Sequence, residues 1–370
     1  MRNTGKSLIR SSTLVLGVLA RTLALRATVF LAEIGHLEKQ ITDALDFEVN
    51  SARLVTVRQE YQDHLQEQGV FYERKANART RTQGSNTEYA IAFDFWKNLP
   101  CPNVTSNDVY YKRQLSVYCF NVHILTTNEV YVYFYNETIA KKGADDVASM
   151  LYDVFTTKIP ENIMNLHLFC DSCGGQNKNW TMFRFFHYMV HSEKRFQSIK
   201  VTYPIRGHSY LECDGDMSHV PQSKRTEHPK DWENAIKSCR RNPSPYNVIT
   251  LPQESYKGFT KFLNQDYRIT SPICSRPIRE MKFEENQPRF LLYKCALGGN
   301  FLTTDVFPKR KSRKNEKSAL QSSYSELLPI SEAKFKDLQV LKQFCSPENR
   351  AFYEQLPSTI HADDNDTDYF

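Results

Sequence analysis

The sequence predicts a mixed α/β protein, with five strands in one mixed sheet and helices packed on its faces. Two observations support this prediction. Three successive segments, at residues 88–95, 115–125 and 129–137, are rich in β-branched and aromatic side chains. Two further apolar segments, at 164–171 and 197–205, each follow a segment with helical periodicity.

The elements follow one another in an order that restricts the topology. Thr127-Asn128 is the turn between the second and third strands, so the first three strands form an antiparallel meander. Residues 142–160 form a helix that places Val147, Leu151 and Val154 on one face. The near-continuous apolar run at 164–171 indicates a strand covered on both faces. Helices at 180–193 and 229–242 flank the fifth strand.

Strands that are separated by helices run parallel and are joined by right-handed crossovers. The order strand, strand, strand, helix, strand, helix, strand, helix is that of the ribonuclease H-like fold. That fold has a mixed five-stranded sheet flanked by helices. We therefore assign it to residues 87–250.

The flanking segments differ in composition from this central region. Residues 1–32 form an N-terminal extension that is basic and has no acidic residue. Residues 33–86 predict a helical hairpin with a turn near Asn50-Ser51, followed by a basic linker that starts near residue 74. Residues 251–320 predict a small α+β accessory region with a basic run at 308–317, and residues 321–370 a helical piece and an acidic tail.

Composition and charge exclude several classes of protein. The chain has 40% hydrophobic and 24% charged residues, typical of a globular protein. No apolar stretch reaches the roughly 20 residues that a membrane-spanning helix needs. Nine cysteines, with Cys170 and Cys173 as the one CxxC pair, indicate a reducing compartment. The net charge of +6 fits a polyanionic partner without requiring one.

Two aspartates stand at the ends of strands that the fold makes neighbours. Asp94 ends the first strand and Asp171 ends the fourth, and these strands lie side by side and parallel in the assigned fold. Two carboxylates this close repel each other and favour a bound cation. Carboxylate oxygens together with substrate phosphates suit Mg²⁺ or Mn²⁺, and two such ions promote in-line attack at phosphorus. The alternatives are a turn aspartate at 94 and a helix N-cap at 171.

A third acid is expected after the fifth strand, where the sequence offers Glu212, Asp214 and Asp216. We prefer Asp214, and the spacing leaves the other two open. The predicted metal site therefore comprises Asp94, Asp171 and Asp214, with two Mg²⁺ or Mn²⁺ ions.

Candidate nucleic-acid contacts surround these acids. Gly174 and Gly175 allow a close backbone approach, and Gln176, Asn177 and Lys178 follow them before a helix N-terminus that favours an anion. A capped, solvated turn is the alternative. Lys112 and Arg113 adjoin two tyrosines, a combination that suits nucleic acid but also an edge strand with packed aromatic stems.

The motif "DSCGGQNKN", followed by "RGHSY" and "LECDGDM", resembles an uncharacterised family of transposase-derived proteins with a ribonuclease H-like, DDE-type integrase domain. The resemblance covers roughly residues 50–310. It implies that Asp94, Asp171 and Asp214 are the catalytic acids, and it adds His208, near the third acid, to the nucleic-acid-binding residues. The upstream cysteines usual in such proteins are absent from residues 30–45.

Two functions stay open at this level. The first is a metal-dependent polynucleotidyl transferase or nuclease acting on DNA. The second is a catalytically inactive nucleic-acid or protein binding module on the same fold, which the missing cysteines favour. The predicted partners are DNA and, as an open question, a second copy of the chain. We expect nuclear residence, with mitochondrial import or secretion as alternatives if residues 1–32 act as a targeting signal.

Overall fold

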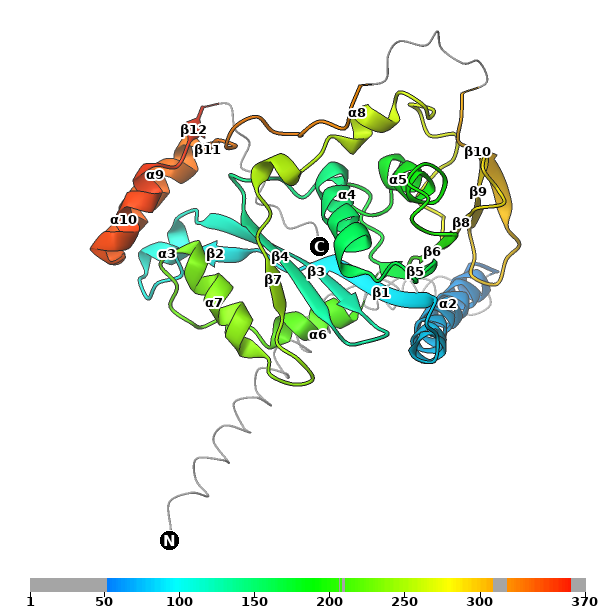
Figure 1. Cartoon of the computed structure of the whole chain (residues 1–370). Coiled ribbons are helices and arrows are strands. Elements are labelled where there is room, and N and C mark those ends of the chain that lie inside the picture. The colour runs from blue at the N-terminus through cyan, green and yellow to red at the C-terminus, as the bar shows by residue number, and fades with distance from the viewer. Residues whose placement is uncertain (1–51, 206, 208–209, 309–317, 361–370) are drawn as a thin grey trace. The chain divides into compact units, whose positions relative to one another are not determined.

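A computed structural model describes residues 52–205, 207, 210–308 and 318–360 of the chain. The chain divides into two compact units, one of residues 1–69 and 205–208 and one of residues 70–204 and 209–370. The described part of the first unit is largely the beginning of helix α2 (Ala52–Gln83). The second unit contains the remainder of α2 and the other helices and strands of the described residues (Figure 1).

The second unit is built on one mixed sheet of ten strands, in the order β10-β9-β8-β6-β5-β1-β3-β4-β7, with β2 paired to β3. The strands are β1 (Glu88–Phe95), β2 (Leu99–Cys101), β3 (Leu115–Ile124), β4 (Val130–Asn136), β5 (Asn165–Cys170), β6 (Ser198–Thr202), β7 (Asn247–Ile249), β8 (Glu280–Glu284), β9 (Phe290–Lys294) and β10 (Leu302–Asp305). A separate two-stranded sheet pairs β11 (Ile330–Ser331) with β12 (Ser358–Thr359).

The mixed α/β class is confirmed, and all five strands expected from the sequence are present as β1, β3, β4, β5 and β6. β1, β3 and β4 form the antiparallel meander, and β5 and β6 continue the sheet parallel to β1. The number of strands was wrong, because the sheet has ten rather than five. β8, β9 and β10 come from the expected accessory region 251–320 and extend this sheet beyond β6.

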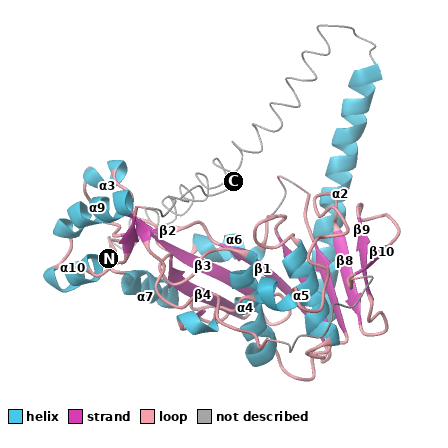
Figure 2. Cartoon of the chain, turned by 90° about the horizontal axis from the view of Figure 1, so that it is seen from above, coloured by secondary structure: helices cyan, strands magenta, loops and turns pink. Residues whose placement is uncertain are grey.

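Helices cover both faces of the sheet (Figures 1 and 2). One face packs against α4 (Ala144–Asp153), its π-helical continuation (Val154–Lys158), α5 (Trp180–His191) and α8 (Phe259–Leu263) in the largest apolar cluster. The other face packs against α6 (Glu212–Ser218), α7 (Pro229–Cys239) and the second half of α2. The described residues also form α3 (Asp108–Tyr111), α9 (Glu332–Leu341) and α10 (Pro347–Glu354). Short 3₁₀ turns lie at Gln253–Ser255 and Lys342–Phe344.

Helix α2 differs from the expectation at its end. The basic segment from residue 74 was expected as a linker, but the helix continues through it to Gln83. The physical reason is that Phe71 and Ala78 are buried against the sheet, so tertiary packing stabilises the helix through a polar stretch. The first helix of the expected hairpin, the extension 1–32, the basic run at 309–317 and the last ten residues lie outside the described residues. Among the described helices, none is long and apolar enough to cross a membrane.

Candidate active site

Asp94 and Asp171 lie on neighbouring parallel strands, as expected. In the register of β1 and β5, Phe93 is opposite Cys170, so the next position on each chain brings Asp94 beside Asp171. Two residues earlier on each strand, Ala92 and Phe169 belong to the apolar cluster under α2 and α6. Because side chains alternate along a strand, the strand periodicity directs both aspartates towards that same face.

Helix α6 brings further acids to this end of the sheet. It is fixed there by two contacts of Cys213: Trp96 Nε1 donates to the Cys213 carbonyl at 2.9 Å, and Cys213 Sγ lies 3.7 Å from the Asn121 carbonyl. Asp214 is in the first turn, where its Oδ2 accepts the Leu211 amide at 2.9 Å and caps the helix. Trp96 is two residues beyond Asp94, so one short segment carries the first acid and the anchor of the helix.

The three aspartates act on one another electrostatically. Burial raises the pKa of Asp94 well above its usual value, and the charges of Asp171 and Asp214 raise it further. Burial also raises the pKa of Asp171, again with a contribution from Asp214. Both residues keep part of their surface accessible to solvent. Among the described residues neither Asp94 nor Asp171 forms an ion pair, so this cluster holds negative charge that nearby cations offset only in part.

Asp171 does not cap the following helix, which answers the alternative left open by the sequence. The N-cap of α5 is Asn179, whose side chain accepts the Met182 amide at 3.0 Å. The Oδ1 atom of Asp171 instead accepts Asn177 Nδ2 at 2.5 Å and the Cys173 amide at 3.2 Å. The glycine-containing turn therefore folds back and orients this carboxylate.

The two alternative third acids are both committed to other partners. Glu212 pairs with Lys75 of α2, with 2.9 Å between Oε2 and Nζ. The pKa values of both Asp94 and Asp171 respond to the charge of Asp214, and neither Glu212 nor Asp216 contributes among the main causes. This electrostatic pattern favours Asp214 as the third member of the cluster.

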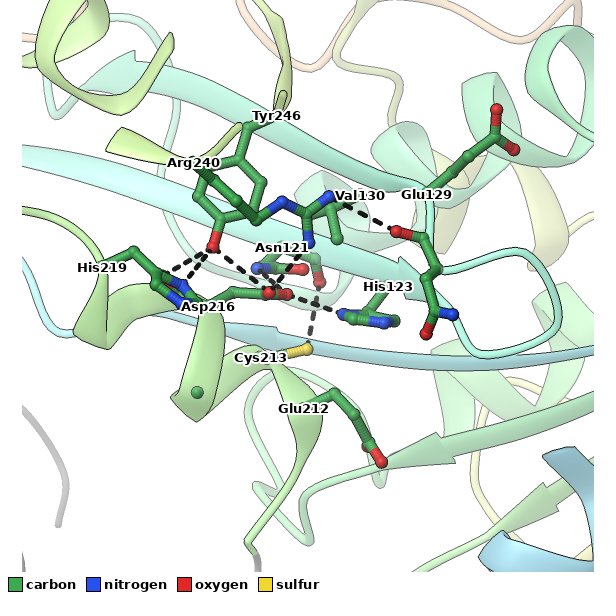
Figure 3. A network of polar contacts seen from close by, with 12 residues as sticks. Asn121, His123, Glu129, Val130, Glu212, Cys213, Asp216, His219, Arg240 and Tyr246 are labelled. Atoms are coloured by element: carbon green, nitrogen blue, oxygen red, sulfur yellow. Dashed lines mark hydrogen bonds and ion pairs between the residues drawn. The ribbon is translucent and has the colours of Figure 1, made fainter. Parts of the chain in front are cut away.

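Asp216 is the centre of a buried polar network (Figure 3). Its Oδ2 accepts His123 Nδ1 at 2.8 Å and Asn121 Nδ2 at 3.1 Å, both from β3. Its Oδ1 lies 3.2 Å from the Tyr246 hydroxyl and 3.5 Å from Arg240 Nη1. The carboxylate is 4% exposed, so four donors from two parts of the chain replace its water shell. The network holds α6 against β3.

Sequence reasoning missed this network, although a signal was present. Asn121 and His123 are polar residues two positions apart in an otherwise apolar strand, so they must share one face. Asn121 is also directly opposite Asp94 in the register of β1 and β3. The Asn121 Oδ1 and His123 Nε2 atoms are buried and have no hydrogen-bond partner among the described residues.

The donor set suits a hard cation, but the side chains do not form a closed cage. Among the described residues no group of three or more His, Cys, Asp or Glu side chains is arranged to hold a metal ion. A hydrated Mg²⁺ or Mn²⁺ needs only one or two carboxylates, because it keeps several of its waters. Asp94 and Asp171, whose pKa values are both raised by burial and by the charge of Asp214 and which form no ion pair among the described residues, fit that requirement.

The expected nucleic-acid contacts beside Asp171 are mostly buried. Asn177 is 0% and Lys178 is 3% exposed, and only Gln176 is partly accessible. Lys178 donates to the Arg276 carbonyl at 3.1 Å and lies over the Tyr203 ring, and burial lowers its pKa to about 8. Asn177 and Lys178 therefore stabilise the turn from within. His208 lies outside the described residues.

Lys112 and Arg113 are engaged by helix α9. Asp337 lies 3.7 Å from Lys112 Nζ and 3.0 Å from Arg113 Nη1, and it also accepts the Arg113 amide at 3.1 Å. Figure 2 shows α3 and α9 side by side at this end of the second unit. The preceding tyrosines, Tyr110 and Tyr111, are 86% and 82% exposed. The two cations hold the loop after α3 to α9, and their predicted contact with nucleic acid stays a prediction.

Together, the fold and the site define a mixed α/β protein with a cluster of mutually repelling carboxylates at one end of its sheet. Residues 112–265 match a family model described as a domain of unknown function (DUF7869). The matched range contains Asp171 and Asp214 and begins after Asp94 and strand β1. Searches of the curated proteins and of the solved structures found no match.

Proposed function

We propose that this chain is a ribonuclease H-like, metal-dependent polynucleotidyl transferase or nuclease that acts on DNA phosphodiesters, derived from a DDE-type transposase. The observation on which the proposal depends is the cluster of Asp94, Asp171 and Asp214. These carboxylates come from a central strand, its parallel neighbour and a following helix, and the pKa of Asp94 responds to both of the other charges. The strand order β4-β3-β1-β5-β6 is the one expected for a ribonuclease H-like sheet and supports the assignment.

In each of the three aspartates, a carboxylate oxygen accepts a hydrogen bond from the chain, and this bond orients the side chain. The backbone amide of Phe95 donates to Asp94 Oδ1 at 2.8 Å, Asn177 donates to Asp171 Oδ1, and the Leu211 amide donates to Asp214 Oδ2. Bound Mg²⁺ or Mn²⁺ would activate a water or a 3′-hydroxyl and stabilise the leaving oxygen. The orienting hydrogen bonds reduce the reorganisation that ion and phosphate binding would need.

Nicking and strand joining of supercoiled DNA by the purified chain, with Mg²⁺ or Mn²⁺, tests the proposal. We expect Asp94→Asn, Asp171→Asn and Asp214→Asn each to lower the rate by about 100-fold or more, because each removes several kcal/mol of charge stabilisation. Glu212→Gln is the matched control, since this acid lies on the same helix and pairs with Lys75. Activity that survives Asp171→Asn would refute the enzymatic proposal. DNA binding without any cleavage would favour the inactive binding module.

We also propose that the protein resides in the nucleus, where its DNA substrate would be. The basic run from Lys309 to Lys314 is the sequence feature that favours this compartment. Imaging of the tagged chain with and without residues 1–32 tests the proposal. A nuclear signal in both forms, lost when Lys309–Lys314 are neutralised, is the expected result, and mitochondrial or secreted protein would contradict it.

A further inference from the structure

A partly enclosed cavity of about 130 Å³ lies between the second half of α2 and strands β5 and β6. Its basic lining groups are Arg74 and Arg81 from α2, His167 from β5 and Lys200 from β6, and Thr202 adds a hydroxyl. The volume is sufficient for several water molecules, and therefore for a tetrahedral oxyanion.

The charges around this cavity do not balance. Arg74, Lys200 and Lys294 all pair with one carboxylate, Glu280, which is 1% exposed. Among the described residues, Arg81 pairs with Glu88 alone, whose Oε2 lies 3.2 Å from its Nε. In the part of the chain that the structure describes, these ion pairs join three lining cations, together with Lys294 outside the lining, to two carboxylates, so positive charge is in excess.

Donor groups remain available at the cavity. Arg81 uses Nη2 to donate to His167 Nε2 at 2.7 Å, and its Nη1 meets no acceptor among the described residues. Lys200 Nζ has one carboxylate contact, at 3.5 Å, for its three protons. A guanidinium fork beside an ammonium group is the donor combination that binds phosphate oxygens.

The basic groups respond to this crowding of positive charge. Burial, together with the charges of Arg81 and Lys200, lowers the pKa of His167 to about 4. Burial also lowers the pKa of Lys200, and the neighbouring Arg74 contributes in the same direction. An anion in the cavity would reduce the repulsion between these cations. A cation would reduce the repulsion between the carboxylates at the ends of β1 and β5 in the same way.

We infer that this cavity is a binding site for a phosphate group, held by Arg81 and Lys200. The inference goes beyond the proposed catalytic function. The excess of positive charge at the cavity does not depend on whether Asp94, Asp171 and Asp214 are catalytic. The site is also placed to receive a nucleic-acid backbone. Phe169 lines the cavity and lies two residues before Asp171, on the same face of the sheet. Two residues along a strand correspond to a distance of about 7 Å between these two positions.

Titration of the full chain with inorganic phosphate, at constant ionic strength, tests the site by calorimetry and by thermal unfolding. We expect saturable binding and a higher Tm, because phosphate binds the folded chain preferentially. Arg81→Gln and Lys200→Met should each weaken phosphate binding by about 10-fold. Lys237→Met is the control, because it removes a cation from an exposed ion pair, with Glu233 on α7.

A second arm distinguishes the source of the phosphate. A labelled single-stranded oligonucleotide that inorganic phosphate displaces, and that the two variants bind more weakly, would identify the ligand as a nucleic-acid phosphodiester. Phosphate binding with unchanged oligonucleotide affinity would identify a free phosphate compound. Absence of saturable phosphate binding, or equal binding in Arg81→Gln, Lys237→Met and the natural chain, would overturn the inference. Arg81→Gln decides the outcome if Lys200→Met does not fold, since the Arg81 side chain is 58% exposed.

Discussion

At Asp94, negative charge opposes folding in the metal-free protein. Burial and the charges of Asp171 and Asp214 raise the folded-state pKa of this carboxyl above its unfolded value of about 3.9. Ionisation is therefore unfavourable in the folded state, and stability is lost as the pH rises through the folded pKa. The effect should be absent below about pH 4, where the carboxyl is protonated in both states.

We therefore predict that metal-free Asp94→Asn is more stable than the natural chain at neutral pH, because the neutral amide removes the unfavourable ionisation of this carboxyl. Urea unfolding at several pH values measures the difference, which should disappear towards pH 4. Saturating Mn²⁺ should reverse the order, because the variant loses a ligand. A metal-free variant that is less stable at pH 7.5 would contradict this prediction.

Asp216 should behave in the opposite way, although it is an aspartate of the same region. Its charge is compensated by Arg240 and by hydrogen bonds from His123, Asn121 and Tyr246. Asp216→Asn leaves the buried Arg240 without its carboxylate and should lower the free energy of unfolding by about 3 kcal/mol. Glu212→Gln, in a more exposed pair with Lys75, should cost no more than about 1 kcal/mol. Urea unfolding measures both variants. Equal losses of unfolding free energy in Asp216→Asn and Glu212→Gln would mean that the Asp216 network contributes little to stability.

At the level of elements, the position of α6 depends on the hydrogen bond from Trp96 to the Cys213 carbonyl. Trp96→Phe removes the indole donor to that carbonyl and should reduce stability by about 1 kcal/mol. Because α6 carries Asp214, the variant should also weaken Mn²⁺ binding, even though every acid is retained. Calorimetric titration with Mn²⁺ measures this second effect.

The matched control is Trp180→Phe. Trp180 Nε1 donates to the Arg268 carbonyl at 2.6 Å, on the opposite face of the sheet, so the same chemical change occurs away from α6. Both variants should lose stability, and only Trp96→Phe should lose Mn²⁺ affinity. If both variants bind Mn²⁺ equally well, the anchoring role of Trp96 is refuted.

Five strands and the major helices could be predicted because each one buries a face whose period is visible in the sequence. The segments 115–125 and 164–171 are both mostly apolar, and both form central strands. β9 and β10 could not be predicted with the same ease, because both are short and their residues are largely exposed or only partly buried. They are stabilised by pairing along the edge of an existing sheet, which depends on residues far away in the sequence.

The candidate site also has features that the sequence predicts and features that depend on contacts between distant residues. Asp94 and Asp171 could be placed together because strand order and parallel direction determine which strand ends meet. The sequence favoured Asp214 without excluding Glu212 or Asp216, since the partners of those two, such as Lys75 and Arg240, are distant in sequence. Asn177 and Lys178 look like surface residues in a polar turn, and only the folding of that turn onto Asp171 buries them.

At the scale of the whole molecule, a net charge of +6 and the proposed function predict DNA binding that weakens as salt rises. Each phosphate contact contributes a slope of about −0.9 in a plot of log affinity against log salt concentration for duplex DNA. Fluorescence anisotropy with a labelled duplex, at several salt concentrations, measures that slope. A salt-independent affinity would indicate that phosphate contacts do not contribute.

The double variant Lys112→Met and Arg113→Gln tests which cations produce the slope. The sequence favoured both as DNA contacts, and loss of two such contacts would reduce the magnitude of the slope by about 1.8. In the structure Asp337 binds both side chains, so their charge is already compensated and their positions are fixed against α9. We therefore expect an unchanged slope together with a lower Tm, because the loop after α3 loses its attachment to α9. A slope reduced by the full amount would show that Asp337 releases these cations to the DNA.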